Sequence, residues 1–218
     1  MKTFKYKSII FDLDGTLADT DEIIIRSFQH VYRTYLGKEM SHEYIYQTFG
    51  ETLDNVFKMQ FPDHYEEALN TYRQYHIEHF DRYVRLYPEA EEMVQWLWKN
   101  NIQLGIATSR MANTAHRILE MFHIKNCFKS IITADDCHHH KPHPEPLLKC
   151  LEKLGAKKEE TVYIGDTKFD LKSAKRAGID FCYVQWGKID FNIEQEKPEY
   201  ILKNWRSLKE LLLLTEAE

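Results

Sequence analysis

Long apolar runs are absent from this 218-residue sequence. No stretch approaches the roughly 18 apolar residues that a membrane-spanning helix needs, and the lysine-bearing start leads into only a short apolar run. We therefore expect no membrane or targeting segment, and a cytoplasmic protein.

Cysteine is scarce as well. The cysteines form neither a C-x-x-C pair nor a dense framework, which favours reduced thiols; they are Cys127, Cys137, Cys150 and Cys182.

Glycine and proline are also few, and neither sign of charge is in large excess. Eight glycines, six prolines and the lack of repeats exclude a fibrous or disordered chain, and 43% hydrophobic residues are typical of a globular protein. The 29 basic and 34 acidic residues are interleaved along the chain and give a net charge of −5. Without a long basic run, nucleic acid is not expected as a partner.

Strand-length apolar runs recur along the chain and alternate with helix-period segments in its second half. The runs are Ser8–Phe11, Ile102–Ala107, Ser130–Thr133, Thr161–Ile164 and Phe181–Val184. Continuous apolar runs of this kind indicate strands that are buried on both faces of a parallel sheet. Gly155 and Gly178 stand where helix C-caps are expected. The pattern predicts an α/β fold, with a three-layer Rossmann-like core.

One region breaks this alternation. Residues 19–87 show helical periodicity and no convincing strand, so we expect an all-helical cap there, inserted into a core of residues 1–18 and 88–218. The spacing from Asp19 to Glu22 resembles a capping box at the start of its first helix. Nine of the thirteen tyrosines lie between Tyr32 and Tyr87. They indicate an aromatic substrate pocket or a small packed core, and packing is favoured.

Residues suited to chemistry follow the predicted strands at their carboxyl ends. They are Asp12 and Asp14, Thr108 and Ser109, Lys141, and Asp166 and Asp170. In an open parallel sheet, ligands bind at this edge. Taken singly, each cluster is explained as well by a surface turn, a helix cap or a loop. Their shared placement after successive strands favours a site.

The carboxylate pair suits phosphoryl transfer. We interpret Asp12 as the nucleophile and Asp14 as the acid/base that protonates the leaving oxygen and deprotonates water. Because phosphate and Asp12 repel each other, the site needs cations, which Lys141 and a Mg²⁺ ion bound by Asp12 and Asp166 would supply. Asp170 is expected to orient its neighbours and not to bind the ion itself.

Substrate contacts are expected from two segments. Thr108 can donate its hydroxyl to a phosphate oxygen, with Ser109 and Arg110 beside it. In the cap, the turn Phe49–Thr52, which contains Gly50 and Glu51, is our candidate for the part that faces the substrate. Glu51 would repel a highly anionic leaving group unless the metal or the nearby Arg110 offsets this repulsion.

The motifs resemble those of a known family. Asp12-Leu13-Asp14-Gly15-Thr16 resembles the signature of the haloacid dehalogenase superfamily, and the other motifs match in order; they are Thr108, Lys141 and Gly165-Asp166-x-x-x-Asp170. The resemblance spans nearly the whole chain. It implies Mg²⁺ bound by the Asp12 side chain, the Asp14 main-chain carbonyl and Asp166, and a helical cap after the first motif. Three further segments are similar to the phosphoglycolate phosphatase and pyrophosphatase branch; they are Leu17-x-Asp19-Thr20, Lys141-Pro142-x-Pro144-Glu145 and Pro198-Glu199-Tyr200.

The expected function is therefore Mg²⁺-dependent hydrolysis of a small phosphorylated metabolite through an aspartyl-phosphate, by a monomer or weak dimer. Pyrophosphate and phosphoglycolate are the substrate types considered. The alternatives are a sugar-phosphate mutase of the β-phosphoglucomutase type and a catalytically idle binding module. Dehalogenation is disfavoured, since it leaves Asp14 and the metal-binding acids without a role. The tract His138-His139-His140 adds imidazoles beside Lys141, either as exposed loop residues or as ligands of a transition metal.

Overall fold

A parallel β-sheet forms the centre of the computed structural model, which describes residues 4–49, 51–188 and 192–213. Its six strands are β1 (Ser8–Phe11), β4 (Gln103–Ala107), β5 (Ser130–Ile132), β6 (Thr161–Gly165), β7 (Asp180–Val184) and β8 (Tyr200–Leu202). They lie in the order β5-β4-β1-β6-β7-β8, and every neighbouring pair is parallel. The predicted α/β fold is confirmed.

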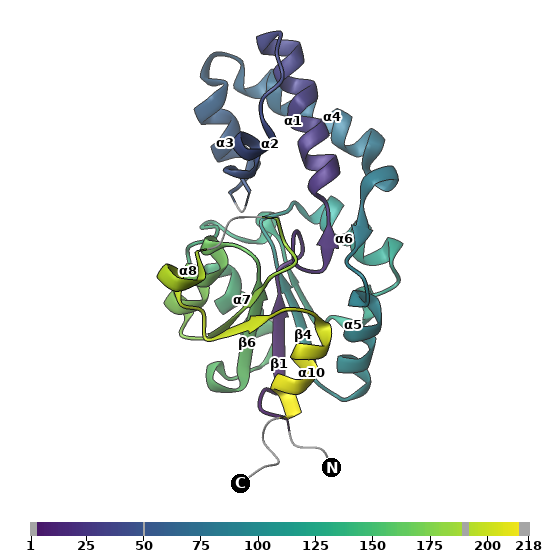
Figure 1. Ribbon diagram of the computed structural model, residues 1–218, viewed down its shortest axis with the longest axis vertical. Coiled ribbons are helices and arrows are strands. Elements are labelled where there is room, and N and C mark those ends of the chain that lie inside the picture. Colours follow the sequence, from purple (N-terminus) through teal and green to yellow (C-terminus); the bar gives the residue numbers. More distant parts are fainter. Residues whose placement is uncertain (1–3, 50, 189–191, 214–218) are drawn as a thin grey trace.

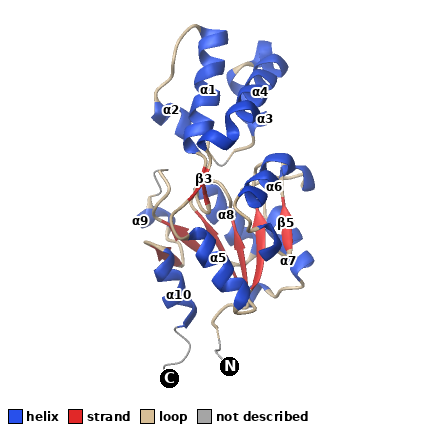
Figure 2. Cartoon of the chain, turned by 90° about the vertical axis from the view of Figure 1, so that its right-hand side faces the viewer, coloured by secondary structure: helices blue, strands red, loops and turns tan. Residues whose placement is uncertain are grey.

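Helices cover both faces of the sheet (Figures 1 and 2). The first face carries α5 (Ala90–Lys99), α6 (Ala112–Met121) and α10 (Trp205–Leu213), and the second carries α7 (Glu145–Leu154) and α8 (Lys168–Ala177). Side chains of β1 alternate between them, because Ile9 and Phe11 pack in the first layer and Ile10 packs in the second. The remaining helices of this part are α9 (Ile193–Glu196), η2 (Lys125–Cys127), η3 (Ala134–Asp136) and η4 (Lys158–Glu160).

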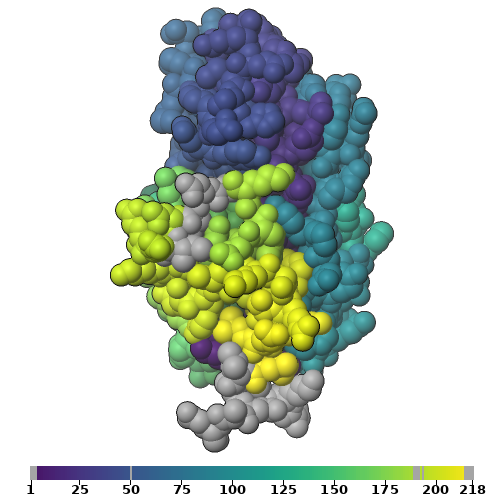
Figure 3. Space-filling view, viewed as in Figure 1, coloured from purple at the N-terminus to yellow at the C-terminus, as the bar shows by residue number. Residues whose placement is uncertain are grey.

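Helices also form a separate lobe above the carboxyl edge of the sheet (Figures 1 and 3). This helical lobe consists of α1 (Asp21–Leu36), α2 (His42–Tyr46), α3 (Leu53–Gln60), η1 (Pro62–His64) and α4 (Tyr65–Tyr83). It has a hydrophobic cluster of its own, in which Phe28 stacks on Phe57 and Tyr32 and meets Tyr72 edge-on. The prediction that the tyrosines of this region serve packing is confirmed for Tyr32, whereas Tyr72 packs in the same cluster and also lines the cavity described below.

Two short strands join the helical lobe to the rest of the chain. β2 (Ala18–Asp19) and β3 (Arg85–Leu86) pair antiparallel as a separate two-stranded sheet. The expectation of no strand between residues 19 and 87 is wrong at these two positions, because two-residue strands leave no periodic pattern in a sequence. Both passages between the lobe and the sheet run through this pair.

The first helix of the lobe also begins differently from the expectation. α1 starts at Asp21, its N-cap residue is Thr20, and the Thr20 side chain makes no capping hydrogen bond. The capping-box reading of Asp19 and Glu22 is therefore wrong. The expected C-caps are confirmed, since Gly155 and Gly178 end α7 and α8 with φ of 66° and 72°. In the described part of the chain, no helix has the length and apolar character needed to cross a membrane.

Candidate active site

The residues predicted to carry chemistry come together at the carboxyl edge of the sheet. Phe11, the last residue of β1, pairs with Ile106 of β4 and Ile164 of β6, so the segments that follow these strands leave the sheet side by side. The Asp12 N–H continues the ladder with a 2.8 Å hydrogen bond to the Ile164 carbonyl. One cavity is lined by most of the predicted residues; they are Asp12, Asp14, Thr108, Ser109, Arg110, Lys141 and Asp166.

Lys141 forms the buried cationic centre of this edge. Its Nζ lies 2.9 Å from Asp12 Oδ1 and 2.7 Å from Asp170 Oδ1, and it also donates to the Tyr163 hydroxyl at 3.2 Å. The Lys141 side chain is only 2% exposed. An ammonium held this way has a raised pKa because the carboxylates of Asp12 and Asp170 outweigh the effect of burial. Lys141 therefore stays charged beside the proposed nucleophile.

Asp170 is fully occupied by donors from its surroundings. Its Oδ1 accepts from Lys141 and from the Tyr163 hydroxyl, the latter at 2.7 Å. Its Oδ2 accepts from the N–H and the hydroxyl of Thr167, at 3.0 and 2.6 Å, in a capping box that begins α8. With both oxygens engaged in this way, Asp170 is placed to hold Lys141 and the loop that follows β6.

Negative charge exceeds positive charge in the buried part of the site. Asp12, Asp166 and Asp170 offer carboxylate oxygens within 4.8 Å of one another, and Lys141 is the cation that contacts Asp12 and Asp170 among the described residues. Burial raises the pKa of Asp12 to about 7 in spite of Lys141, and Asp170 and Asp14 add to the rise. Burial, with Asp170 and Asp12, raises the pKa of Asp166 well above its usual range.

The turn after β1 is shaped around Asp166. Gly15 has φ of 72°, and a Cβ at this position would lie 2.1 Å from Asp166 Oδ2. The Thr16 hydroxyl reaches Asp166 Oδ1 at 3.4 Å. Two buried carboxylates with few donors and excess negative charge are what a hard divalent cation requires, so Asp12 and Asp166 fit Mg²⁺.

Asp14, two residues after Asp12, is held by Arg110. The guanidinium donates from Nη2 to Asp14 Oδ1 at 2.6 Å and from Nε to Oδ2 at 2.9 Å, and the Thr20 hydroxyl adds a bond to Oδ1. Burial alone would raise the pKa of Asp14, but Arg110 and Thr20 outweigh burial and lower it. The predicted acid/base residue is therefore an ion-paired carboxylate here.

The same guanidinium connects the sheet to the helical lobe. Arg110 Nη1 lies 3.1 Å from Nε2 of His76 in α4, and His76 Nδ1 lies 3.2 Å from the Ser27 hydroxyl in α1. Burial, together with the charge of Arg110, lowers the pKa of His76 to about 3, so the ring is neutral and Nε2 can accept from Arg110. Sequence reasoning missed both Thr20 and His76. His76 lies in the middle of the amphipathic helix α4, where its position indicates packing, and Thr20 precedes α1, where its hydroxyl is expected to cap the helix.

The cavity has a volume of about 900 Å³, and the helical lobe forms its upper wall. Phe28, Tyr72 and His76 come from α1 and α4, while Glu51 and Thr52 come from the segment before α3. Among the described tyrosines, Tyr72 alone lines it. Glu51 thus lies at the cavity, where it accepts a 3.2 Å bond from Asn55. Gly50, the other predicted residue of this turn, lies outside the described residues.

Comparison with known proteins identifies the family of this chain. The family model for haloacid dehalogenase-like hydrolases matches residues 9–184. The chain belongs to this family. The match begins in β1 and ends with β7, so this hydrolase has its nucleophile candidate, cap region and acidic loop all within the family's span.

Curated relatives of this hydrolase are named pyrophosphatase PpaX. The protein from Bacillus mycoides is 36% identical over 209 residues, with 95% of this chain and 97% of the relative covered. The one from Oceanobacillus iheyensis is 35% identical and covers 93% and 94%. A solved structure from Lactobacillus plantarum, provisionally assigned as a phosphoglycolate phosphatase, superposes with a TM-score of 0.86 at 26% identity, over 95% of this chain and 99% of that one.

Proposed function

We propose that this hydrolase is a Mg²⁺-dependent phosphatase that forms an aspartyl-phosphate on Asp12. The observation that carries the proposal is the position of Asp12 directly after β1, where it is ion-paired to Lys141 and lines the same cavity as Asp166. The names of the relatives support phosphate chemistry. A reaction in which Asp12 attacks carbon, as in dehalogenation, would need neither Asp14 as acid/base nor Asp166 as a metal ligand.

The first half-reaction uses Asp12 as nucleophile. An Asp12 oxygen forms a bond to phosphorus and the bond from phosphorus to the leaving oxygen breaks. When Arg110 turns from Asp14 to the substrate, burial raises the pKa of Asp14, which takes up a proton from solvent and passes it to the leaving oxygen. Lys141 neutralises the carboxylate and the incoming phosphoryl group. Thr108 and Ser109 would contact the phosphoryl oxygens, which is supported by their position in the lining of the cavity.

In the second half-reaction, water attacks the aspartyl-phosphate. Asp14 takes the proton from that water, the bond from phosphorus to the Asp12 oxygen breaks, and free phosphate and the Asp12 carboxylate result. The side chains of Asp12 and Asp166 and the main-chain carbonyl of Asp14 would hold Mg²⁺, which offsets negative charge on the phosphoryl group. Asp170 keeps Lys141 in position and need not touch the ion.

Residues 19–87 act in this proposal as a cap that closes over the substrate. The β2/β3 pair is the link about which the lobe would move, and Arg110 and His76 connect the closed lobe to Asp14. A cavity with this wall suits a small phosphorylated metabolite and excludes phosphoproteins and long nucleic acids. Gly50 and Glu51 are the proposed cap residues at the substrate.

Pyrophosphate and phosphoglycolate are the two substrates that we propose. Both carry a second anionic group, for which Arg110 offers a cation inside the cavity. A monomer or weak dimer suffices, since one chain supplies all of the residues above. Four free cysteines support a reducing, cytoplasmic location.

A screen of small phosphate compounds with the purified protein tests the proposal. Phosphate release should require Mg²⁺ and should be highest with pyrophosphate or phosphoglycolate. An isomerised sugar phosphate without free phosphate would indicate a mutase, and activity that does not depend on Mg²⁺ would contradict the metal assignment. Binding without turnover of any compound would favour a non-catalytic module.

A further inference from the structure

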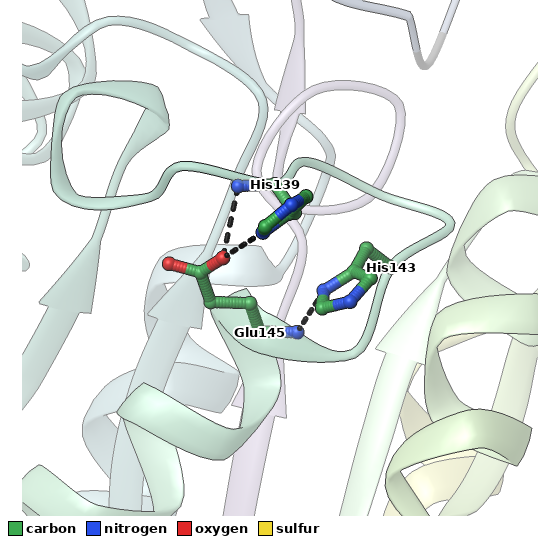
Figure 4. Close-up of side chains that lie close together, drawn as sticks. All are labelled: His139, His143 and Glu145. Carbon is green, nitrogen blue, oxygen red and sulfur yellow. Dashed lines mark hydrogen bonds and ion pairs between the residues drawn. The ribbon is translucent and has the colours of Figure 1, made fainter.

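The loop that carries Lys141 also carries four histidines to which the reaction above gives no role, and two of them, His138 and His140, line the cavity. The four are His138, His139, His140 and His143, and Glu145 begins α7 directly after them. His139, His143 and Glu145 point toward one another in the curve between this loop and the start of α7 (Figure 4). Both histidines are exposed, whereas Lys141 between them is buried.

Backbone hydrogen bonds hold these three side chains close to one another. The Glu145 carboxylate accepts from the N–H groups of His138 and His139, at 3.0 and 2.9 Å, so the loop curls around the start of α7. His139 Nδ1 lies 2.9 Å from Glu145 Oε2, and His143 Nδ1 accepts from the Glu145 N–H at 3.2 Å. The centroids of the two imidazole rings are 4.5 Å apart.

We propose that His139, His143 and Glu145 form a binding site for a divalent transition-metal ion such as Zn²⁺, separate from the acidic magnesium site. One ligand atom from each of the three residues lies within 4.8 Å of the others. Two imidazole nitrogens and one carboxylate oxygen are a ligand set that Zn²⁺ takes in proteins, with water in the fourth position. Imidazole suits Zn²⁺, Ni²⁺ and Cu²⁺ and does not suit Mg²⁺.

Binding requires small changes in this exposed loop. The ion replaces the hydrogen-bonding proton between His139 and Glu145, and His143 gives up its contact with the Glu145 N–H or turns to present Nε2. His139 is 67% exposed, so its ring can turn without unpacking. Lys149, 2.8 Å from Glu145 Oε1, competes with the metal for this carboxylate.

The site is coupled to the active site through Lys141. His139 and His143 each stand two residues from Lys141, on opposite sides of it, and Lys141 contacts Asp12. A metal that bridges the two histidines tightens the segment between them, because ligands around Zn²⁺ lie closer together than 4.8 Å. We therefore expect Zn²⁺ to slow turnover.

Co²⁺ titration followed by visible absorption tests the binding, with excess Mg²⁺ present to fill the acidic site. The wild-type chain should give the absorption bands of tetrahedral Co²⁺. The double variant His139→Gln/His143→Gln should bind at least about 10-fold more weakly, and the control His42→Gln, an exposed histidine of α2, should bind like wild type. Equal affinity of the double variant and wild type would overturn the site.

Two further measurements separate binding at this site from general metal effects. Lys149→Gln removes the competing ammonium and should tighten Co²⁺ binding, whereas weaker binding would contradict the role given to Glu145. Zn²⁺ should lower kcat at saturating Mg²⁺ in wild type and not in the double variant. Inhibition that persists in the double variant would come from Zn²⁺ bound at another site. It would contradict the coupling between the histidine site and Lys141. The binding measurement needs no substrate, so its outcome does not depend on the proposed phosphatase activity.

Discussion

At the scale of single residues, Arg110 has the most demanding position in the site. Its side chain is only 7% exposed, yet it pairs with the proposed acid/base residue, contacts the neutral His76 of the helical lobe and lines the cavity. Both oxygens of Asp14 are occupied while this pairing lasts. A substrate with a second anionic group can draw Arg110 away and leave Asp14 free to reach the leaving oxygen.

Replacement of Arg110 tests this competition. Arg110→Ala should lower kcat/KM for pyrophosphate or phosphoglycolate by about 10- to 100-fold, since a hydrogen bond to a charged group contributes about 1.5–3 kcal/mol. The loss should be much smaller for an ester with an uncharged leaving group. Arg117→Ala, a control at an arginine of α6 that pairs with Asp81, should leave both values unchanged. Equal losses for both substrate classes would contradict leaving-group recognition.

The sequence predicts some of these residues and cannot predict others. Asp12, Asp14, Lys141 and Asp166 follow strands that are readable from their apolar runs, so their meeting at one edge is predictable. His76 contacts Arg110 across 34 residues, and its helical spacing indicates only a packed face. The Thr20 side chain suits a helix N-cap. In the structure its hydroxyl donates to Asp14 Oδ1 instead, and only the three-dimensional position of Asp14 reveals this.

At the scale of elements, the turn after β1 determines how near Asp12 and Asp166 can lie. Gly15→Ala brings two penalties, a left-handed backbone conformation and a Cβ that would overlap Asp166. Gly37→Ala is a matched control, because Gly37 has φ of 64° and no atom within 4 Å of its added Cβ. Both should lower stability by roughly 1 kcal/mol from backbone strain. Only Gly15→Ala should also weaken Mg²⁺ binding, and calorimetry that finds equal affinities would contradict the metal position.

The segment before α3 is the element that brings the helical lobe to the cavity. Thr52 caps α3 through a 3.4 Å bond from the Asn55 N–H, which fixes Glu51 beside the cavity. Glu51→Ala should change the relative kcat/KM values among small phosphates and leave Mg²⁺ affinity unchanged. Glu78→Ala, at an exposed position of α4, is the control. An unchanged specificity profile would contradict the substrate-facing role of this segment.

Element prediction from sequence succeeds where burial imposes a pattern. β1, β4, β6 and β7 lie between two helical layers and read as apolar runs. β8 lies at the sheet edge with Ile201 exposed, and β2 and β3 have two residues each, so no pattern identifies them. The link between the lobe and the sheet is therefore visible only in three dimensions.

At the scale of the whole molecule, the excess of buried carboxylates makes stability depend on pH. The pKa of Asp12 rises from its usual 3.8 to about 7. Between these values the folded protein binds more protons than the unfolded chain, so without Mg²⁺ its stability falls as pH rises through this range. Asp166 acts in the same direction. The lowered pKa of Asp14 keeps that residue ionised in the folded protein across this pH range. Asp14 therefore does not add to the fall in stability with rising pH.

Magnesium should reverse this dependence, because it competes with the protons. Thermal unfolding is expected to show a larger Mg²⁺-induced rise in Tm at pH 8 than at pH 5, at roughly 2–4 °C per kcal/mol for a protein of this size. Asp12→Asn should flatten the pH dependence. A rise in Tm that is the same at both pH values would show that Mg²⁺ does not bind at the titrating carboxylates.

The covalent intermediate is the central claim, and chemical-quench mass spectrometry tests it most directly. Wild-type protein is mixed with Mg²⁺ and its best substrate, quenched in acid during turnover, and digested. The peptide that contains Asp12 should carry one added phosphoryl group. Asp12→Asn should show no such peptide, with turnover lower by several orders of magnitude. Steady phosphate release without phosphorylated peptide, or phosphorylation at another residue, would contradict the account.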